Sequence, residues 1–215
     1  MNVYIMFKPK RNVLYCICAI LILLVGIVLD RVISHTIYNI ENNDLKECEL
    51  HYWATKSELT DSVQAYINKV APTSDLRASA LLDICEKYSF DVKFALAQGE
   101  IESHFGTKGL AAKTNSVWNV GAFDKMTFSD ILKKHKYSHP NESIEPYVKL
   151  IYEKYMTSTT EEGLMYKFVD HNGNRYATSK DYEERLRFKY KTILNTTKID
   201  SLQNQLSYWS IRANR

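Results

Sequence analysis

The 215-residue chain is poor in residues that interrupt regular structure, with only seven glycines and four prolines. No glycine- or serine-rich linker and no internal repeat divides it, so one domain behind the N-terminal part is the simplest expectation. The six histidines and four cysteines show no spacing typical of zinc ligands, so we expect neither a metal nor another cofactor. Basic residues form no clustered face of the kind that binds nucleic acid, and no nucleic-acid partner is expected.

The few cysteines leave two interpretations open. Cys16 and Cys18 lie in an apolar run, where they read as small hydrophobic residues. Cys48 and Cys85 would both face an oxidising compartment if the chain is exported, and could then form a disulfide. Cys85 also falls in a helical apolar pattern, where burial without a bond is equally natural.

The longest uncharged stretch is Val13–Leu29, which consists almost entirely of Leu, Ile, Val, Cys and Ala. At about 1.5 Å per residue it approaches the thickness of a bilayer's hydrocarbon core. Three basic residues between positions 8 and 11 precede it, which predicts a cytoplasmic N-terminus and an exported C-terminal domain. A cleaved signal peptide is the alternative, but no small-x-small site follows before Asp30.

Charge separates the chain into parts. Four of the 28 Lys and Arg and one of the 25 Asp and Glu fall in the first 31 residues, which leaves 24 of each sign for the rest. The net charge of +3 therefore comes from the residues that flank the apolar stretch, where basic residues set the orientation of a membrane helix. We expect a cytoplasmic N-terminus (1–12), a transmembrane signal-anchor helix (13–33), a polar stalk (34–56) and one exported domain (57–215).

Apolar periodicity in the exported part is mainly helical. The Asn-Gly turn within 171–174 predicts a short β-hairpin, and Asp75 is expected to cap a helix. The expected fold is therefore a mainly α (α+β) domain with a small β-hairpin region, preceded by one transmembrane helix. The expected helices are Leu59–Val70, Leu76–Tyr88, Val92–Phe105, Phe128–Lys136, Ser143–Met156 and Asp181–Leu194.

The expected helix Val92–Phe105 carries the most informative residue. Spacing of three and four places four apolar residues in one stripe: Phe94, Ala97, Ile101 and Phe105. Glu102 stands beside this stripe, in a row with the uncharged Ala95, Gln98 and Gly106. Partial burial there would raise its pKa and suit it to donate a proton near neutral pH. Glu100 turns to the other side, near Lys93 and His104, and is expected on a solvated face, as most helical glutamates are.

Four segments resemble the glucosaminidase family of the lysozyme-like superfamily, which includes bacterial and phage endo-β-N-acetylglucosaminidases. The first segment is similar to the family's Ala-Gln-x-x-Leu-Glu-Ser-x-aromatic-Gly helix end, and the others follow in the family's order. Asn119 and Ser179 stand where many members have Gly and Asp. The four segments are Gln98–Gly106, Asn115–Gly121, Ser138–Ile151 and Tyr176–Tyr182.

The resemblance implies a lysozyme-like fold and assigns Glu102 as the catalytic acid. It makes Tyr176 the residue to test as a second catalytic group, and Asp124 is the first candidate for a second carboxylate. Glu142 and Glu145 are weaker candidates, because a carboxylate that opens a helix is stabilised there without any catalytic role.

Further residues are candidates for substrate binding. Trp118 could offer a flat face to a sugar ring or belong to the core, and these two readings carry equal weight. Asn115 and Asn119 could hydrogen-bond sugar hydroxyls or N-acetyl groups, or only stabilise the backbone of a tight turn. The full set is Gln98, Ser103, Asn115, Trp118, Asn119 and Tyr147.

The function expected from these observations is a membrane-anchored endo-β-N-acetylglucosaminidase acting on peptidoglycan. Its partners would be peptidoglycan glycan strands and, through residues 13–33, the membrane. A lytic transglycosylase or a muramidase would use the same acid. An alternative from a different class is a non-catalytic peptidoglycan-binding or structural module of a membrane or virion assembly.

Overall fold

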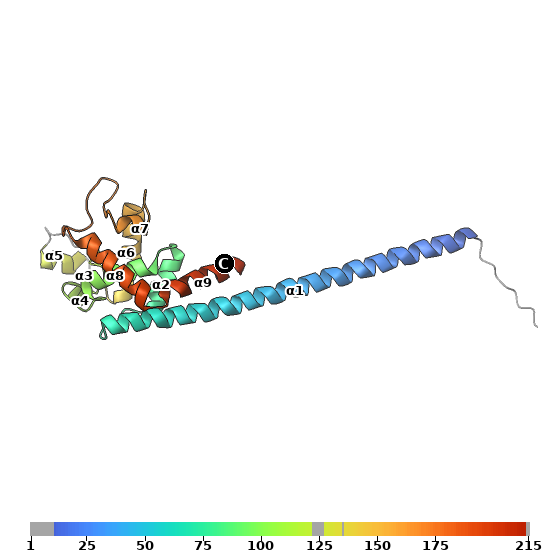
Figure 1. Cartoon of the computed structure of the whole chain (residues 1–215), viewed down its shortest axis with the longest axis horizontal. Helices are drawn as coiled ribbons and strands as arrows, with labels where there is room; N and C mark the ends of the chain where they lie inside the picture. The colour runs from blue at the N-terminus through green and yellow to red at the C-terminus, as the bar shows by residue number, and fades with distance from the viewer. Residues whose placement is uncertain (1–10, 122–126, 135, 214–215) are drawn as a thin grey trace, which may run out of the picture. The chain divides into compact units, whose positions relative to one another are not determined.

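A computed structural model describes residues 11–121, 127–134 and 136–213, and it is mostly helical (Figure 1). It divides into two compact units, residues 52–208 and residues 1–51 with 209–215, which are described separately. The helices are α1 (Arg11–Val70), α2 (Ala78–Lys87), α3 (Val92–Ser103), α4 (Ala111–Thr114), α5 (Phe128–Lys134), α6 (Ile144–Leu150), α7 (Glu161–Leu164), α8 (Tyr182–Thr196) and α9 (Ile199–Arg212), with a 3₁₀ turn η1 (Pro140–Ser143) and a π-helical turn η2 (Ile151–Tyr155).

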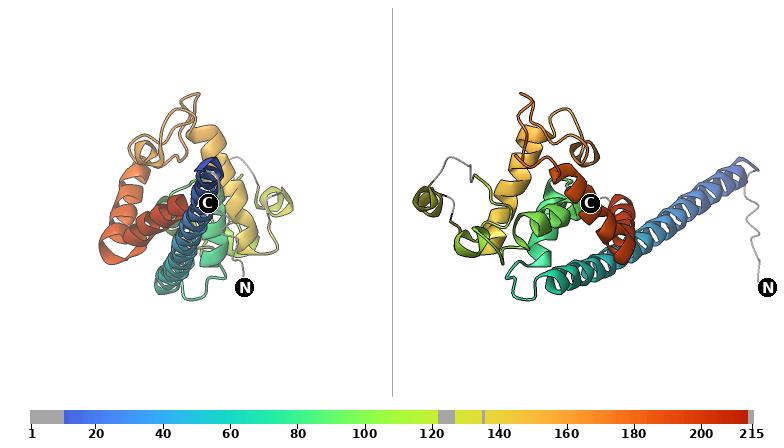
Figure 2. Two further views of the ribbon diagram at one scale, coloured as in Figure 1. Left: turned by 90° about the vertical axis from the view of Figure 1, so that its right-hand side faces the viewer. Right: turned by 60° about the vertical axis from the view of Figure 1, so that its left-hand side comes forward.

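Helix α3 forms the centre of the unit 52–208. It carries small and apolar residues on all sides, as a helix enclosed by others must, and every residue from Val92 to Glu100 is buried. Figure 2 shows its green ribbon between the yellow α6 and the orange α8. The core around it is completed by the last turns of α1 and by α2. Residues at the C-terminal end of α3 are therefore held by a rigid scaffold.

Helix boundaries follow local chemistry, and one predicted cap is wrong. Helix α1 ends at Val70, directly before Ala71-Pro72, as expected. Helix α2 begins at Ala78 rather than Leu76, and its N-cap position, Arg77, makes no side-chain capping bond. Asp75 therefore does not cap it. Helix α3 does begin with a capping bond, because the Asp91 side chain accepts the backbone N–H of Lys93 at 2.9 Å.

The predicted β-hairpin is not shown as a pair of strands: among the described residues, one isolated antiparallel bridge joins Val169 to Arg175. The Asp170 side chain accepts the backbone N–H groups of Asn172 and Asn174. Backbone bonds also cross this turn at 2.9 Å, from the Asp170 N–H to the Asn174 carbonyl and from the Tyr176 N–H to the Phe168 carbonyl. Backbone and side-chain bonds therefore hold the turn together.

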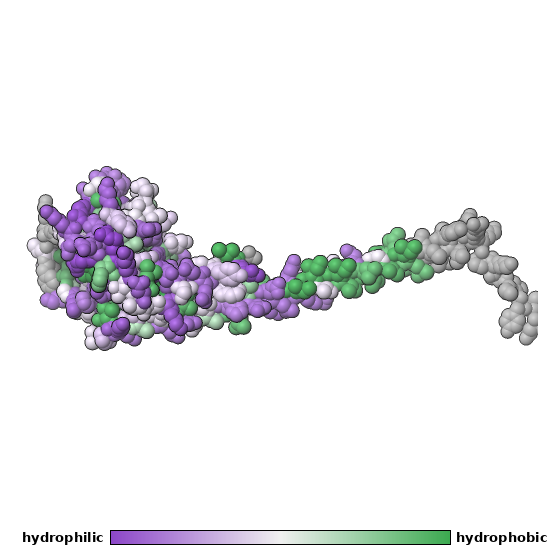
Figure 3. All heavy atoms as spheres, viewed as in Figure 1, coloured by the Kyte–Doolittle hydropathy of each residue, from purple (hydrophilic) through white to green (hydrophobic). Residues whose placement is uncertain are grey.

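The unit of residues 1–51 and 209–215 contains the apolar half of α1. Its leucine, isoleucine and valine side chains from Ile20 to Ile40 are largely exposed, and Figure 3 shows them as a green band. Among the described residues, α1 is the one helix long and apolar enough to cross a membrane. The segment 34–56, expected to be a polar stalk, continues the same helix without a break. Near its end the His51 ring stacks on Trp209, with centroids 4.5 Å apart.

Cys48 and Cys85 are both buried free thiols, so the disulfide left open above is not present. Burial raises the pKa of the Cys85 thiol well above its usual value. Cys85 therefore packs as a small apolar residue of α2.

Candidate active site

The C-terminal end of α3 positions Glu102. The helix stops at Ser103 because His104 and Phe105 take left-handed backbone conformations, with φ of 48° and 52°. The Ser103 hydroxyl donates to the Val117 carbonyl at 2.6 Å and accepts the Gly106 N–H at 2.7 Å. Ser103, predicted as a binding residue, is thus buried and joins the helix end to the following turn.

That turn brings two asparagines into left-handed conformations, with φ of 56° at Asn115 and 51° at Asn119. Asparagine tolerates this region of backbone conformation better than most residues. Asn119 can therefore occupy the position where the family resemblance leads us to expect glycine. Asn115 donates its side-chain amide to the carbonyls of Tyr137 and Ser138 and so holds the backbone. Asn119 instead donates to the Glu102 carbonyl at 3.2 Å and to its Oε2 at 3.3 Å.

Glu102 is partly buried and is held by two side chains. The Tyr182 hydroxyl donates to Glu102 Oε1 at 2.6 Å, in addition to the Asn119 contact with Oε2. Burial raises the pKa of Glu102 above its usual value, while the two hydrogen bonds and the charge of Arg185 act against that rise. The result is a carboxyl group that protonates more readily than an exposed glutamate.

A chain of hydrogen bonds extends inward from Glu102. Tyr147 donates to Gln98 Oε1 at 2.6 Å, and Gln98 Nε2 donates to the Tyr182 oxygen at 3.0 Å. Because the Tyr182 oxygen accepts from Gln98, its own proton is directed to Glu102. Gln98, Tyr147 and Tyr182 are all buried, so the chain fixes the position of the acid from inside the core. Tyr182 was missed as a site residue, although it closes the Tyr176–Tyr182 segment singled out in the sequence.

Trp118 belongs to the core. It is 1% exposed, stacks on the buried Tyr147 with ring centroids 4.4 Å apart, and donates its Nε1–H to the Ala95 carbonyl at 3.0 Å. Neither ring presents a face to a ligand in this structure. Of the predicted binding residues, Asn119 alone touches the Glu102 carboxyl, and Gln98 reaches it through Tyr182.

Tyr176, the predicted second group, is half-buried, and its phenol interacts electrostatically with the charge of Glu102. Its ring stacks on Phe168 with centroids 4.4 Å apart and lies 5.6 Å from the ring of Tyr182. Burial, with the nearby charge of Glu102 adding to it, raises the pKa of the Tyr176 phenol well above its usual value. Tyr176 is therefore a neutral phenol at physiological pH. Asp124 lies outside the described residues.

The remaining acidic candidates make structural contacts. Glu142 accepts the N–H and hydroxyl of Ser138, and Glu145 accepts from the side chains of Lys87 and Tyr88.

The expectation that Glu100 is solvated is wrong. Glu100 is 5% exposed, accepts a hydrogen bond from Tyr66 at 2.5 Å and pairs with Lys189. Both partners come from other helices, α1 and α8, which the pattern of α3 alone does not reveal.

In the part of the chain that the structure describes, no three His, Cys, Asp or Glu side chains gather as metal ligands. The Glu102 carboxyl is partly desolvated and is held by directed hydrogen bonds on a rigid scaffold, and acid-base sites commonly share these properties. The family described as mannosyl-glycoprotein endo-β-N-acetylglucosaminidase matches residues 78–194, more than half of the chain. The chain therefore belongs to the glucosaminidase family, which implies a glycoside hydrolase acting on glycans. No curated protein and no solved structure was found to match it.

Proposed function

We propose that this protein is a membrane-anchored endo-β-N-acetylglucosaminidase that cleaves the β-1,4 glycan of peptidoglycan, with Glu102 as general acid. The observation that carries the proposal is the environment of Glu102, whose pKa is raised by burial while Tyr182 and Asn119 hold its two oxygens. An acid that protonates the leaving group of a glycoside needs such a raised pKa to keep its proton near neutral pH.

The geometry indicates which oxygen carries the proton. Oε1 already accepts the short bond from Tyr182, so the proton of the neutral acid sits on Oε2. Asn119 Oδ1 is buried without a hydrogen-bond partner, and rotating that amide end for end would let it accept this proton. Asn119 can thus pair with either protonation state of Glu102 until the glycosidic oxygen arrives.

In the reaction, Oε2–H of Glu102 protonates the glycosidic oxygen as the bond to the anomeric carbon breaks. Positive charge develops on the sugar ring, and water then adds to the anomeric carbon while Glu102 recovers a proton. A second group must stabilise the charge or orient the water. Tyr176 is our first candidate because it adjoins Glu102, and as a neutral phenol it would act through its dipole and hydroxyl rather than as an anion. Asp124 is the second candidate.

Membrane anchoring by residues 13–33 is part of the proposal. The apolar stretch of α1 has the length and composition of a membrane span, and the basic residues before it favour a cytoplasmic N-terminus. This orientation would place the acid on the exported side, where peptidoglycan lies.

Product analysis tests the proposal and distinguishes it from the alternative activities. Full-length protein in detergent would be incubated with peptidoglycan sacculi, and the soluble fragments identified by mass spectrometry. Reducing N-acetylglucosamine ends are the expected product. Reducing N-acetylmuramic acid would identify a muramidase, and 1,6-anhydro ends a lytic transglycosylase. Binding to sacculi without any fragment would instead identify a non-catalytic module.

A further inference from the structure

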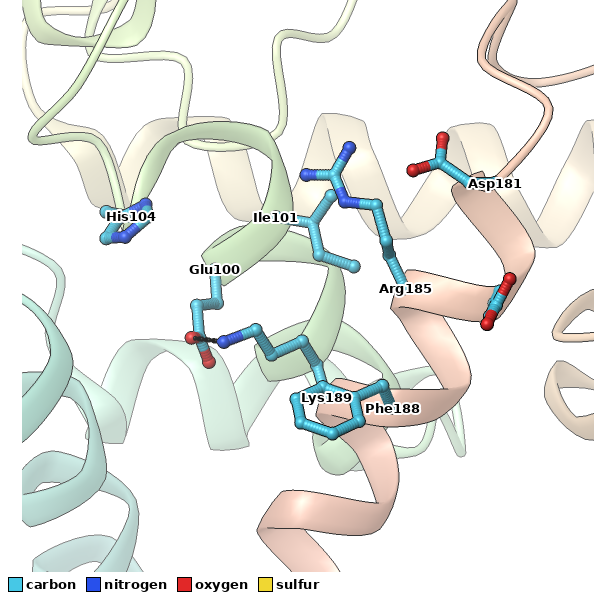
Figure 4. Close-up of a pocket in the computed structure, with 8 residues that line it drawn as sticks. Glu100, Ile101, His104, Asp181, Arg185, Phe188 and Lys189 are labelled. Atoms are coloured by element: carbon cyan, nitrogen blue, oxygen red, sulfur yellow. Dashed lines mark hydrogen bonds and ion pairs between the residues drawn. The ribbon is translucent and has the colours of Figure 1, made fainter.

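A cavity of about 360 Å³ opens between α3 and α8, beside the acid. Eight residues line it (Figure 4): Glu100, Ile101 and His104 from α3, Asp181 immediately before α8, and Glu184, Arg185, Phe188 and Lys189 from α8. Its volume lies within the range of small-ligand sites. Glu102 itself does not line the cavity, but the lining residue Arg185 acts electrostatically on Glu102, and Asp181 directly precedes Tyr182, which donates to the Glu102 carboxyl. The cavity is therefore close to the place where the glycan would be cleaved.

The two cations of this cavity differ in their partners. Lys189 pairs with Glu100, which also accepts from Tyr66, so its charge is balanced within the fold. Arg185 makes no side-chain hydrogen bond or ion pair with any described residue. In Figure 4 Lys189 points to Glu100 and Arg185 points away from it. The charge of Arg185 opposes the rise that burial causes in the pKa of Glu102, and it adds to the lowering of the Asp181 pKa that the bond from Ser179 chiefly causes. The guanidinium therefore interacts with Glu102 as well as with the cavity rim.

The rest of the lining combines apolar and acidic surface. Phe188 is 66% exposed and Ile101 is partly buried, and these two residues supply the apolar part of the lining. Asp181 and Glu184 are exposed carboxylates on the α8 side. A purely anionic ligand would be repelled by these carboxylates, and a purely cationic one by Arg185. An uncharged sugar could accept hydrogen bonds from the exposed guanidinium, but a carboxylate would form the stronger, charge-assisted and bidentate pair with it.

We propose that this cavity binds the peptide attached to the glycan strand, with a peptide carboxylate on Arg185 and its small apolar side chains against Ile101 and Phe188. Peptidoglycan peptides carry carboxylates, amide or amino donors and alanine methyls together, which is the mixture the lining complements. The inference rests on the proposed function, because the peptide reaches the cavity only when its glycan strand lies against Glu102. The enzyme would then prefer peptide-bearing over bare glycan.

Binding to two forms of glycan tests this inference. Full-length protein carrying Glu102→Gln, which prevents turnover, is co-sedimented with intact sacculi and with glycan whose peptides were removed by an amidase. The parent should bind intact sacculi more tightly. Adding Arg185→Gln or Phe188→Ala should weaken that binding by about fivefold, the worth of one exposed charge or contact of roughly 1 kcal/mol, and leave binding to stripped glycan unchanged.

Lys191→Gln is the matched control, because it removes one positive charge from an exposed position of α8 that lines another cavity. It should leave both affinities unchanged. Equal binding of the parent to both glycans would overturn the inference, as would an equal loss on both glycans in the Arg185 variant, which would show a contact to the sugar chain.

Cleavage of stripped glycan by the wild type reports separately on the proposed hydrolase. Cleavage without any preference for peptide-bearing glycan contradicts only the peptide site. A peptide-dependent binding preference without cleavage contradicts only the hydrolase.

Discussion

Replacing Tyr182 with phenylalanine should move the pH dependence of activity to higher pH. The substitution keeps the buried ring and its packing on Phe168 and Tyr176 but removes the hydroxyl that donates to Glu102 Oε1 at 2.6 Å. That bond stabilises the ionised carboxylate, so its loss raises the pKa of Glu102 further. Because a general acid must be protonated, activity disappears as pH rises through this pKa.

The size of the shift follows from the strength of the bond. A hydrogen bond to a charged group contributes about 1.5–3 kcal/mol, and one pKa unit corresponds to about 1.4 kcal/mol. Water that enters beside the partly buried Glu102 would replace part of this interaction. We therefore expect the alkaline limb of kcat/KM to move up by about 1 pH unit. The assay is release of soluble fragments from sacculi, measured from pH 4 to pH 9.

Tyr190→Phe provides the matched control on the same helix. Tyr190 donates to Asp91 Oδ2 at 2.6 Å, so the chemical change is the same at a site that does not touch Glu102. Each variant should lose about 1–3 kcal/mol of unfolding free energy, because a partly buried carboxylate loses a hydrogen bond. An alkaline limb that stays in place or moves down in Tyr182→Phe, or that moves equally in Tyr190→Phe, would refute the reasoning.

Three further predictions follow from the surroundings of Glu102. Asn119→Gly suits the left-handed backbone and removes the 3.3 Å bond to Oε2. The alkaline limb of the pH–rate profile should therefore move to higher pH, by less than in Tyr182→Phe, and a move to lower pH would contradict this. Gly99→Ala would place a Cβ 3.2 Å from both Phe105 and Trp118, and thermal denaturation should show a loss of about 1–3 kcal/mol, whereas a stabilised variant would show that the core has room. Trp118→Ala should lower the unfolding free energy by about 3–5 kcal/mol in denaturant titrations; a variant of wild-type stability with impaired sacculus binding would make Trp118 a sugar platform instead.

The partial burial of Glu102 could be predicted from the sequence, because the two properties needed lie within one helix. Glu102 is offset from the apolar stripe and has uncharged helical neighbours, and the structure places it partly buried. The same reasoning failed for Glu100. Its burial depends on Tyr66, 34 residues earlier, and on Lys189, 89 residues later, and no periodicity within α3 reveals either partner.

The role of Tyr182 was hidden for the same reason, since it lies 80 residues from Glu102 in the chain. Helix α9 was not predicted at all. Its sequence is rich in Ser, Gln and Asn, and only two of its residues, Ile199 and Leu202, are buried, so its apolar signal is weak. Helix existence could thus be predicted where the buried face is broad, and contacts between distant helices could not.

The most direct test of the account compares Glu102→Gln with wild type in glycan cleavage. The substituted amide retains an oxygen to accept from Tyr182 and gains a donor at the Oε2 position, from which Asn119 can accept through Oδ1 once its amide has rotated end for end, so the fold should be kept. Glu153→Gln, at an exposed position of η2, is the matched control. The account predicts that Glu102→Gln binds sacculi and unfolds at the wild-type temperature but releases no fragments, while Glu153→Gln cleaves normally. Fragment release by Glu102→Gln at the wild-type rate would contradict the central claim that Glu102 is the acid.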